Sequence, residues 1–239
     1  MEAFPLAPQH PNIVGSFGHI NDLISYDSQQ VRDECDIVEI RLDLLLQQGW
    51  QLGQTPWAGL KNAGLPLLFT ARCCSEGGAG QLTNHDRENL LLNVSADAAL
   101  IDIELVNARE MVALRHHCQH KSIPWIASFH DFTRLPDISS LESKTIESQR
   151  LGASAFKVAA TLLEMNDMIR LESFQFNQRD FPVSSMGMGL LALESRIRCG
   201  IAGSVLNYGY LGTNATAPGQ CGANELREQI FQRRQLSEQ

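Results

Sequence analysis

The chain has 239 residues, 44% of them hydrophobic, and a formal net charge of −8 at pH 7. The length and apolar content suit an α/β barrel, which needs about 250 residues, and the acidic charge argues against a nucleic-acid or anionic-membrane surface, because both need basic patches. The six cysteines are scattered without a C-x-x-C pair, so we expect neither a disulfide framework nor a zinc site.

The chain opens with a Pro-rich segment, residues 1–11, which we expect to be loosely held. Its first residues, Met-Glu-Ala-Phe, lack the basic start and the apolar run of a signal peptide. No later stretch is long and apolar enough to span a bilayer. With cysteine usage typical of a reducing compartment, these features predict a soluble, cytoplasmic protein.

From residue 12 onwards, short β-type runs alternate with longer runs of helical periodicity. The predicted strands cover residues 12–18, 36–43, 65–72, 99–105, 124–130, 155–159, 182–188 and 204–208. The predicted helices cover residues 21–35, 55–62, 84–96, 107–119, 139–151, 163–177, 190–199 and 223–235. This alternation implies right-handed parallel crossovers, and at this length a closed (β/α)₈ barrel (TIM barrel) fits better than an open sheet. Because no linker divides the chain, we predict a single barrel domain over residues 1–239.

The predicted strand at residues 155–159 carries one lysine, Lys157, among small and apolar residues. A lysine is almost never buried in an apolar strand unless it is paired or functional. Burial disfavours the ammonium form, so the pKa of Lys157 should fall, and a partly neutral lysine can form a Schiff base with a ketone or aldehyde. On this strand alone, an edge-strand lysine with its head group in water is an equally good interpretation.

Charged and polar residues recur at or just after the ends of the predicted strands, where (β/α)₈ barrels build their active sites. In the second strand Glu39, Arg41 and Asp43 share one face. They must pair with one another or bind something polar. The later candidates at or just after strand ends are the charged or polar residues Arg72, Glu76, Asp102, Glu104, His130, Arg196, Thr216 and Gln220, with the apolar Met186 and Met188. A structural ion network explains the second-strand charges equally well, but the recurrence at so many strand ends favours an active site.

His130 and Lys157 belong to neighbouring predicted strands, so they can face each other at the barrel mouth. An iminium on the lysine would stabilise a carbanion at the adjacent carbon, and the imidazole would move the proton. A carboxylate such as Glu76 would hold the imidazole in one tautomer, and arginines would bind an anionic substrate. The sequence has no metal-binding motif and no G-x-G-x-x-G after a strand, so we expect neither a metal nor a nicotinamide cofactor.

Taken together, these residues resemble the motifs of type I 3-dehydroquinate dehydratase, the Schiff-base enzyme of the shikimate pathway. The resemblance runs from about Pro11 to the last helix, and its motifs keep the order and spacing of the family. They are Glu39–Asp43, Leu68–Arg72 with Glu76–Gly78, Ile101–Glu104, Ser128–Phe132, the strand with Lys157, Ser195–Arg196, and Ala217–Gln220.

The resemblance implies a syn dehydration of 3-dehydroquinate to 3-dehydroshikimate in aromatic amino acid biosynthesis, without a metal or cofactor. Lys157 would form the imine with the C3 ketone, His130 would move the proton, and Glu76 would pair with His130. The implied substrate-binding residues are Ser16, Glu39, Arg41, Arg72, Met186, Met188, Arg196, Thr216 and Gln220, with Arg196 on the substrate carboxylate. The implied partners are this small molecule and a second copy of the chain, because the family commonly forms homodimers.

Two other hypotheses remain at this point. Another class I Schiff-base lyase or aldolase on the same barrel would use Lys157 but would not need to hold a polyhydroxylated ring. The feature that separates it from a dehydratase is whether Arg41, Arg72 and Arg196 converge on one anionic ring. A non-enzymatic relative would normally lose Lys157 or His130, and both are present.

Overall fold

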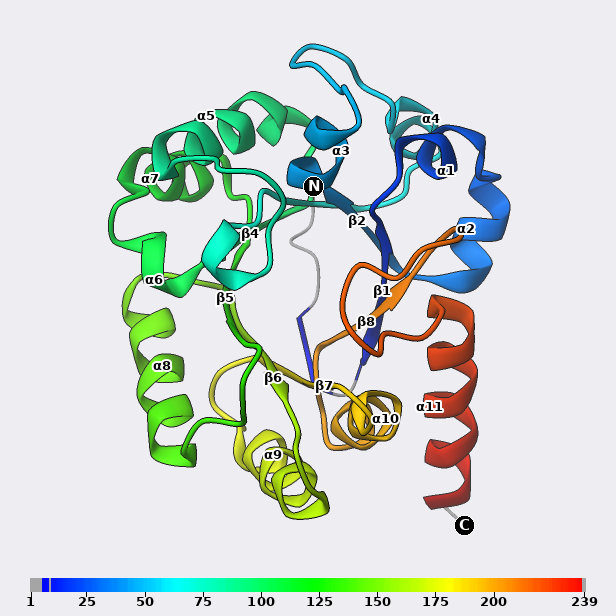
Figure 1. Ribbon diagram of the computed structural model, residues 1–239, viewed down its shortest axis with the longest axis vertical. Helices are drawn as coiled ribbons and strands as arrows, with labels where there is room; N and C mark the ends of the chain where they lie inside the picture. Colours follow the sequence, from blue (N-terminus) through cyan, green and yellow to red (C-terminus); the bar gives the residue numbers. More distant parts are fainter. Residues whose placement is uncertain (1–5, 9, 238–239) are drawn as a thin grey trace.

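The computed structural model describes residues 6–8 and 10–237. Its strands are all parallel and form one eight-stranded sheet in the order β7-β6-β5-β4-β3-β2-β1-β8, with the helices around its outside (Figure 1). The barrel closes between β7 and β8, where the N–H of Val205, directly before β8, donates a hydrogen bond of 3.1 Å to the Val183 carbonyl. The predicted single (β/α)₈ barrel is therefore confirmed. In the predicted loose segment at residues 1–11, residues 1–5 and 9 lie outside the described residues.

The elements alternate along the chain as predicted. The strands are β1 (Asn12–Phe17), β2 (Ile37–Arg41), β3 (Leu67–Thr70), β4 (Leu100–Glu104), β5 (Trp125–Asp131), β6 (Ala155–Thr161), β7 (Val183–Met188) and β8 (Leu206–Tyr210). The helices are α1 (Ile20–Ser25), α2 (Ser28–Glu34), α3 (Leu42–Gln47), α4 (Ala58–Asn62), α5 (Asn84–Val94), α6 (Leu105–Ala108), α7 (Val112–Lys121), α8 (Ile138–Arg150), α9 (Met165–Asn177), α10 (Ala192–Ile201) and α11 (Ala223–Ser237). Two 3₁₀ turns, η1 (Cys74–Glu76) and η2 (Ser95–Asp97), complete the described elements.

The apolar core has two parts, because alternate residues of each strand face the helices or the barrel interior. In β4, Ile101 and Ile103 belong to the larger, outer cluster, which packs against the helices. Leu100 belongs to the inner cluster, and Asp102 and Glu104 follow it on the same face. The interior is therefore apolar where the strands begin and polar where they end, which collects the charged side chains at the carboxyl-end mouth.

The predicted helix at residues 21–35 is wrong as one element, because the chain forms two helices there. α1 ends at Ser25, and Tyr26 has an extended backbone with ψ 134°. The carboxylate of Asp27 then accepts hydrogen bonds from the N–H groups of Gln29 and Gln30. An aspartate that satisfies the first N–H groups of a helix starts a new helix at the next residue.

Two further predicted elements are also corrected. The strand predicted to reach residue 43 ends at Arg41, and Asp43 lies in the first turn of α3. Asp43 therefore meets Arg41 by folding back at the strand end, not by sharing a strand face with it. The helix predicted at residues 107–119 is divided into α6 and α7, with Met111 preceding the second at φ −80° and ψ 56°.

Candidate active site

Lys157 lies on β6, between β5 and β7, with Ser128 and Ser184 as its neighbours in register. The residue is only 4% exposed, so the interpretation as an edge-strand lysine with a solvated head group is wrong. Burial lowers the pKa of Lys157 below the usual lysine value, against the opposing charges of Asp102 and Glu39.

The amine of Lys157 is held by a carboxylate on β4. Its Nζ donates a hydrogen bond of 3.1 Å to Asp102 Oδ2. Arg72 binds both oxygens of the same carboxylate, at 2.9 and 3.0 Å, and Ser128 Oγ donates to Asp102 Oδ1 at 2.5 Å. Burial acts to raise the pKa of Asp102, but the charges of Arg72 and Lys157 keep it well below its usual range. Asp102 is therefore an anion that fixes the positions of both cations.

A second buried carboxylate, Glu104, fixes the end of β3. Glu104 Oε1 accepts hydrogen bonds from Arg72 Nη1 at 3.1 Å and from the Cys73 N–H at 3.0 Å, and Arg87 Nη2 binds Glu104 Oε2. Arg87 comes from α5 and also donates to the carbonyl of Ala71 at 2.7 Å. The burial of Arg87 could not be predicted from the sequence, because a cation in a helix is usually a surface residue.

Glu76 and His130 meet across the gap between η1 and the end of β5. Glu76 Oε2 lies 2.8 Å from His130 Nδ1 and accepts a bond of 2.9 Å from the His130 backbone N–H. Burial raises the pKa of Glu76 to about 8. Burial, with the charges of Arg72 and Lys157, lowers the pKa of His130 well below 6.5. Both pKa shifts favour the neutral forms of Glu76 and His130 at neutral pH, so the imidazole is free to accept a proton.

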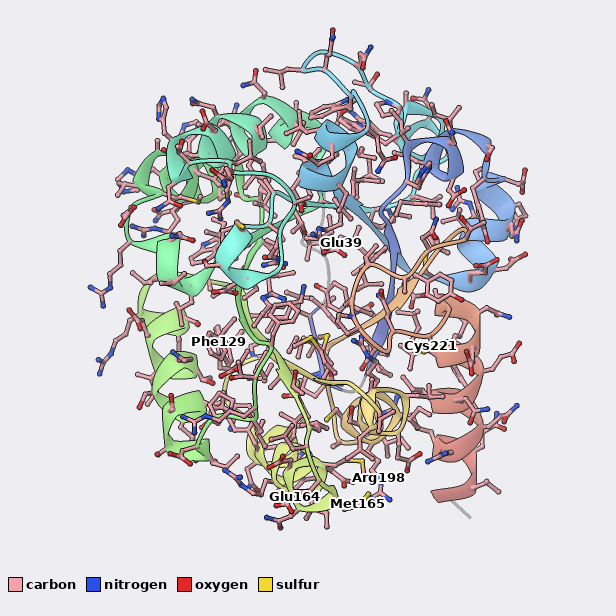
Figure 2. All side chains as sticks on the ribbon, viewed as in Figure 1. Glu39, Phe129, Glu164, Met165, Arg198 and Cys221 are labelled. Carbon is pink, nitrogen blue, oxygen red and sulfur yellow. The ribbon has the colours of Figure 1, made fainter. Side chains whose placement is uncertain are left out.

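Glu39 is bound by hydroxyl groups inside the barrel, where Figure 2 shows it within the ring of strands. Ser16 Oγ donates to Glu39 Oε2 at 2.5 Å, and Thr70 Oγ1 donates to Glu39 Oε1 at 2.8 Å. Lys157 Nζ lies 4.0 Å from Glu39 Oε1. Two hydroxyl donors and a nearby ammonium satisfy this buried carboxylate.

Arg41 connects α3 to the loop that follows β8. Its Nε and Nη2 donate to the two oxygens of Asp43, at 2.9 and 2.7 Å. Its Nη1 donates to the carbonyl of Thr216 at 3.4 Å. In the same loop, Gln220 Oε1 accepts from both the N–H and the hydroxyl of Thr216, at 2.9 Å each. These contacts place Thr216 and Gln220 over the barrel mouth.

Arg196 differs from the other two arginines because it has no carboxylate partner within residues 6–8 and 10–237. It lies on α10 with 2% exposure, and its Nη1 donates to the carbonyl of Tyr208 at 2.7 Å and contacts Met186 Sδ at 3.6 Å. Its Nε has no hydrogen-bond partner in the described part of the chain. Burial lowers the pKa of Arg196 to about 10, and a buried, unneutralised guanidinium is a binding site for an anion.

All the site residues expected from the sequence line one cavity at the mouth of the barrel. They are Ser16, Glu39, Arg41, Arg72, Glu76, His130, Lys157, Met186, Met188, Arg196, Thr216 and Gln220. Arg41, Arg72 and Arg196 thus converge on one space, as a dehydratase of an anionic ring requires. Arg41 and Arg72 are already paired with carboxylates, which leaves Arg196 as the cation in this cavity best able to bind an anion.

The sequence interpretation did not assign Phe132 and Tyr208 to the site, although both line the cavity. Phe132 is the last residue of the Ser128–Phe132 motif, and its ring packs over Gly77, so its place in the motif was the available signal. Tyr208 occurs on an inward-facing position of β8. Strand alternation could have indicated this, but the predicted strand ended at this residue and carried no charged neighbour.

The described residues include no group of three or more His, Cys, Asp and Glu side chains placed to share a metal ion. Among the same residues, no helix is long and apolar enough to cross a bilayer.

The family model for type I 3-dehydroquinase matches residues 21–237. The chain belongs to the type I 3-dehydroquinase family. It is 32% identical to the 3-dehydroquinate dehydratase of Methanothrix thermoacetophila over 90% of this chain and 89% of the relative. It is 30% identical to the catabolic 3-dehydroquinate dehydratase of Acinetobacter baylyi over 82% of this chain and 75% of the relative.

The fold is similar to that of the 3-dehydroquinate dehydratase from Geobacillus kaustophilus, with a TM-score of 0.83 and 23% identity over 95% of this chain and 93% of that structure. Membership of the type I 3-dehydroquinase family confirms the expected enzyme class, a hydro-lyase, and the expected reaction. The aldolase and the non-enzymatic interpretations are therefore wrong.

Proposed function

We propose that this type I 3-dehydroquinase dehydrates 3-dehydroquinate to 3-dehydroshikimate through an imine on Lys157. The observation that carries the proposal is the buried Lys157 amine in one cavity with the His130–Glu76 pair and the unneutralised Arg196. These groups supply a nucleophile, a base with its orienting partner, and an anion site, which are the parts that an imine-based elimination needs.

In the proposed reaction, the neutral amine of Lys157 attacks the C3 ketone, and loss of water gives a protonated imine. The lowered pKa of Lys157 makes the neutral amine more available than in an exposed lysine. His130 removes the C2 proton, and the electron pair passes to the iminium to form an enamine. The C1 hydroxyl leaves as water with the proton from His130, and hydrolysis of the imine releases the enone and the free lysine.

The His130–Glu76 contact supports the assignment of His130 as the base. Glu76 Oε2 accepts from the backbone N–H of His130 and lies 2.8 Å from Nδ1. We infer that Nδ1 carries the proton and donates to Glu76, which leaves the lone pair of Nε2 for the substrate. Glu76 thereby fixes the tautomer and the orientation in which His130 takes the C2 proton.

The rest of the cavity suits a small, hydroxylated carboxylic acid. Arg196 would bind the carboxylate, because it is the cavity arginine without an acidic partner in the part of the chain that the structure describes. The hydroxyls and amide of Ser16, Thr216 and Gln220, with Glu39, Arg41 and Arg72, would bind the ring hydroxyls. Met186 and Met188 give the ring an apolar wall.

The decisive experiment is borohydride reduction of the enzyme with 3-dehydroquinate, followed by intact mass and peptide mapping. We expect one adduct, on the peptide with Lys157, and none in Lys157→Ala, which should lose all measurable turnover. Lys121→Ala is the matched control, because Lys121 is exposed at the end of α7. Turnover in Lys157→Ala would rule out the covalent mechanism.

The proposed order of steps predicts a different result for His130→Ala. Imine formation uses Lys157 and precedes proton removal, so this variant should accumulate the borohydride-trapped adduct while enone absorbance stays at background. Loss of both the adduct and the product, in a folded protein, would contradict a role for His130 after the imine.

We further infer that the protein works in the cytoplasm, in the shikimate pathway of aromatic amino acid biosynthesis. All of its cysteines are free, which suits a reducing compartment. The pathway assignment is tested by deleting the gene and growing the cells without and with aromatic amino acids. Growth without the supplement would contradict the biosynthetic role, and fractionation of the tagged protein tests the compartment.

We also propose that two copies of the chain associate. Exposed apolar side chains on neighbouring helices support this, namely Ile146 on α8 and Met165, Ile169 and Phe176 on α9. Light scattering after gel filtration should give twice the chain mass of 26.5 kDa. A mass of one chain at micromolar concentration would overturn the proposal.

A further inference from the structure

Tyr208 places its aromatic ring against the amine of Lys157. Lys157 Nζ lies over the Tyr208 ring, 3.9 Å from its centroid. Tyr208 is 3% exposed and belongs to the inner apolar cluster with Met186 and Met188. A cation over the face of an aromatic ring at this distance is attracted by the ring quadrupole, and more strongly where water is excluded.

The charged and titratable groups around Lys157 come from several strands. Asp102 on β4 lies 3.1 Å from Nζ, and Glu39 on β2 lies 4.0 Å away. Arg72, just after β3, and His130 on β5 complete the set that interacts electrostatically with the amine. β8 contributes no charge to this set and presents the Tyr208 ring instead.

The Tyr208 hydroxyl does not explain the position of the ring. Its Oη is buried and has no hydrogen-bond partner among the residues that the structure describes. Burial and the nearby charges of Glu39 and Asp102 raise the pKa of Tyr208 well above 10, so the group remains a neutral phenol. The contact that the side chain makes with the reacting group is therefore that of the ring face.

The backbone of Tyr208 binds Arg196, independently of the side chain. Its carbonyl accepts the hydrogen bond of 2.7 Å from Arg196 Nη1, so the residue connects the lysine and the anion-binding arginine. A change of the side chain leaves this carbonyl in place. The effect on Lys157 can therefore be measured apart from the effect on Arg196.

We propose that Tyr208 is a positioning residue for the imine chemistry, and that its ring face stabilises the positive charge on Lys157 Nζ. The inference rests on the proposed role of Lys157. The nitrogen is cationic in the free enzyme as the ammonium and again in the protonated imine, which is the electron-withdrawing group of the elimination. The ring can interact with both cations, and Lys157 also lines the cavity that would hold the substrate.

The test replaces Tyr208 by phenylalanine and by phenylalanines with one and three ring fluorines, which keep the shape and weaken the quadrupole stepwise. Above the pH midpoint of trapping, the free amine is neutral and only the imine carries the positive charge. In this pH range the rate of borohydride trapping on Lys157 and the kcat should fall together along the series. From Phe to trifluoro-Phe we expect a loss on the order of 30-fold, which corresponds to about 2 kcal/mol for a desolvated cation–π contact.

A second measurement separates this role from a merely structural one. Quinate has the carboxylate and hydroxyls of the substrate but no ketone, so its Kd reports the anion and hydroxyl site without imine formation. The Kd for quinate should stay constant along the series. Because the ring favours the cation, the pH midpoint of trapping should move to lower pH as the ring is fluorinated.

Two other results would contradict the role of the Tyr208 ring. A flat fluorine series, or a quinate Kd that weakens in parallel with trapping, would overturn the inference. Tyr208→Leu removes the ring face and should lose at least as much trapping as the trifluoro variant, and Tyr210→Phe controls for loss of a β8 tyrosine hydroxyl. If the unmodified enzyme itself shows no adduct on Lys157, then the proposed function fails, which is a different result from a flat series.

Discussion

At the residue scale, the buried charges of the site differ in whether the protein itself supplies a partner for them. Asp102 and Glu39 are satisfied by donors that the protein itself supplies, whereas Arg196 has no carboxylate partner in the described chain. The neutral His130–Glu76 pair lies beside these groups. A cavity with paired carboxylates and one unneutralised cation is prepared for an anionic substrate.

Glu76→Gln tests how the base is supported. The amide keeps an oxygen acceptor for His130 but, unlike the carboxyl group, cannot ionise when the imidazolium forms. We expect kcat to fall on the order of 10²-fold, while borohydride still traps the imine on Lys157. Steady-state kinetics and intact mass measure the two effects, and an unchanged kcat would remove Glu76 from the proton-transfer step.

The same substitution tests the raised pKa of Glu76. A carboxyl group with a pKa of about 8 in the folded state and about 4.3 when unfolded binds more protons folded than unfolded between these values. The contribution of Glu76 to the free energy of unfolding is therefore fully present below about pH 4. It is lost as the pH rises from about 4 to about 8. Relative to the wild type, Glu76→Gln should gain stability between pH 5 and pH 8, by at most about 1.4 kcal/mol per pH unit. Urea unfolding at both pH values measures this, and a constant difference would contradict the shift.

At the element scale, short turns after the strands position the reacting groups. η1 carries Glu76 and is followed by Gly77, whose φ of +81° suits glycine. A Cβ on Gly78 would lie 2.0 Å from the carbonyl oxygen of Arg72. The turn can therefore approach the end of β3 only because residue 78 has no side chain.

Gly78→Ala should thus displace η1 and lower the free energy of unfolding by about 1 kcal/mol or more, as overpacked sites do. It should also reduce kcat, because Glu76 moves with η1. Gly59→Ala is the matched control. A Cβ on Gly59 would have no neighbour within 4 Å, and alanine in a helix gains up to about 1 kcal/mol over glycine. Thermal unfolding and kinetics of both variants decide the matter, and wild-type activity in Gly78→Ala would show that the turn tolerates the shift.

At the scale of the whole molecule, the parallel barrel brings together residues that are far apart in sequence. Ser16 and Gln220 lie near opposite ends of the chain, yet both line the cavity, because β1 pairs with β8. The inner apolar cluster closes the barrel below the polar mouth. The site therefore exists only when the sheet is complete.

This dependence predicts how the protein unfolds in urea. Trp50, Trp57 and Trp125 are buried in the outer core, so their fluorescence reports packing of the helices on the sheet, and far-UV circular dichroism reports the backbone. Because one sheet joins all the strands, we expect the two signals and the enzymatic activity to be lost in one coincident transition. Separate midpoints would show that part of the barrel unfolds independently.

The sequence by itself determined the alternation of strands and helices and the barrel, and it predicted most of the residues that line the cavity. Local periodicity encodes the alternation, and the motifs at the strand ends led to the cavity residues. It did not determine the break at Asp27 or the start of α3 at Leu42, because capping and strand ends depend on local hydrogen bonds that outweigh a continuous pattern. Only the tertiary structure decided which charges neutralise each other. Ion pairing depends on distances between strands, so the lone Arg196, the buried Arg87 and the Tyr208 ring under Lys157 became visible only in the fold.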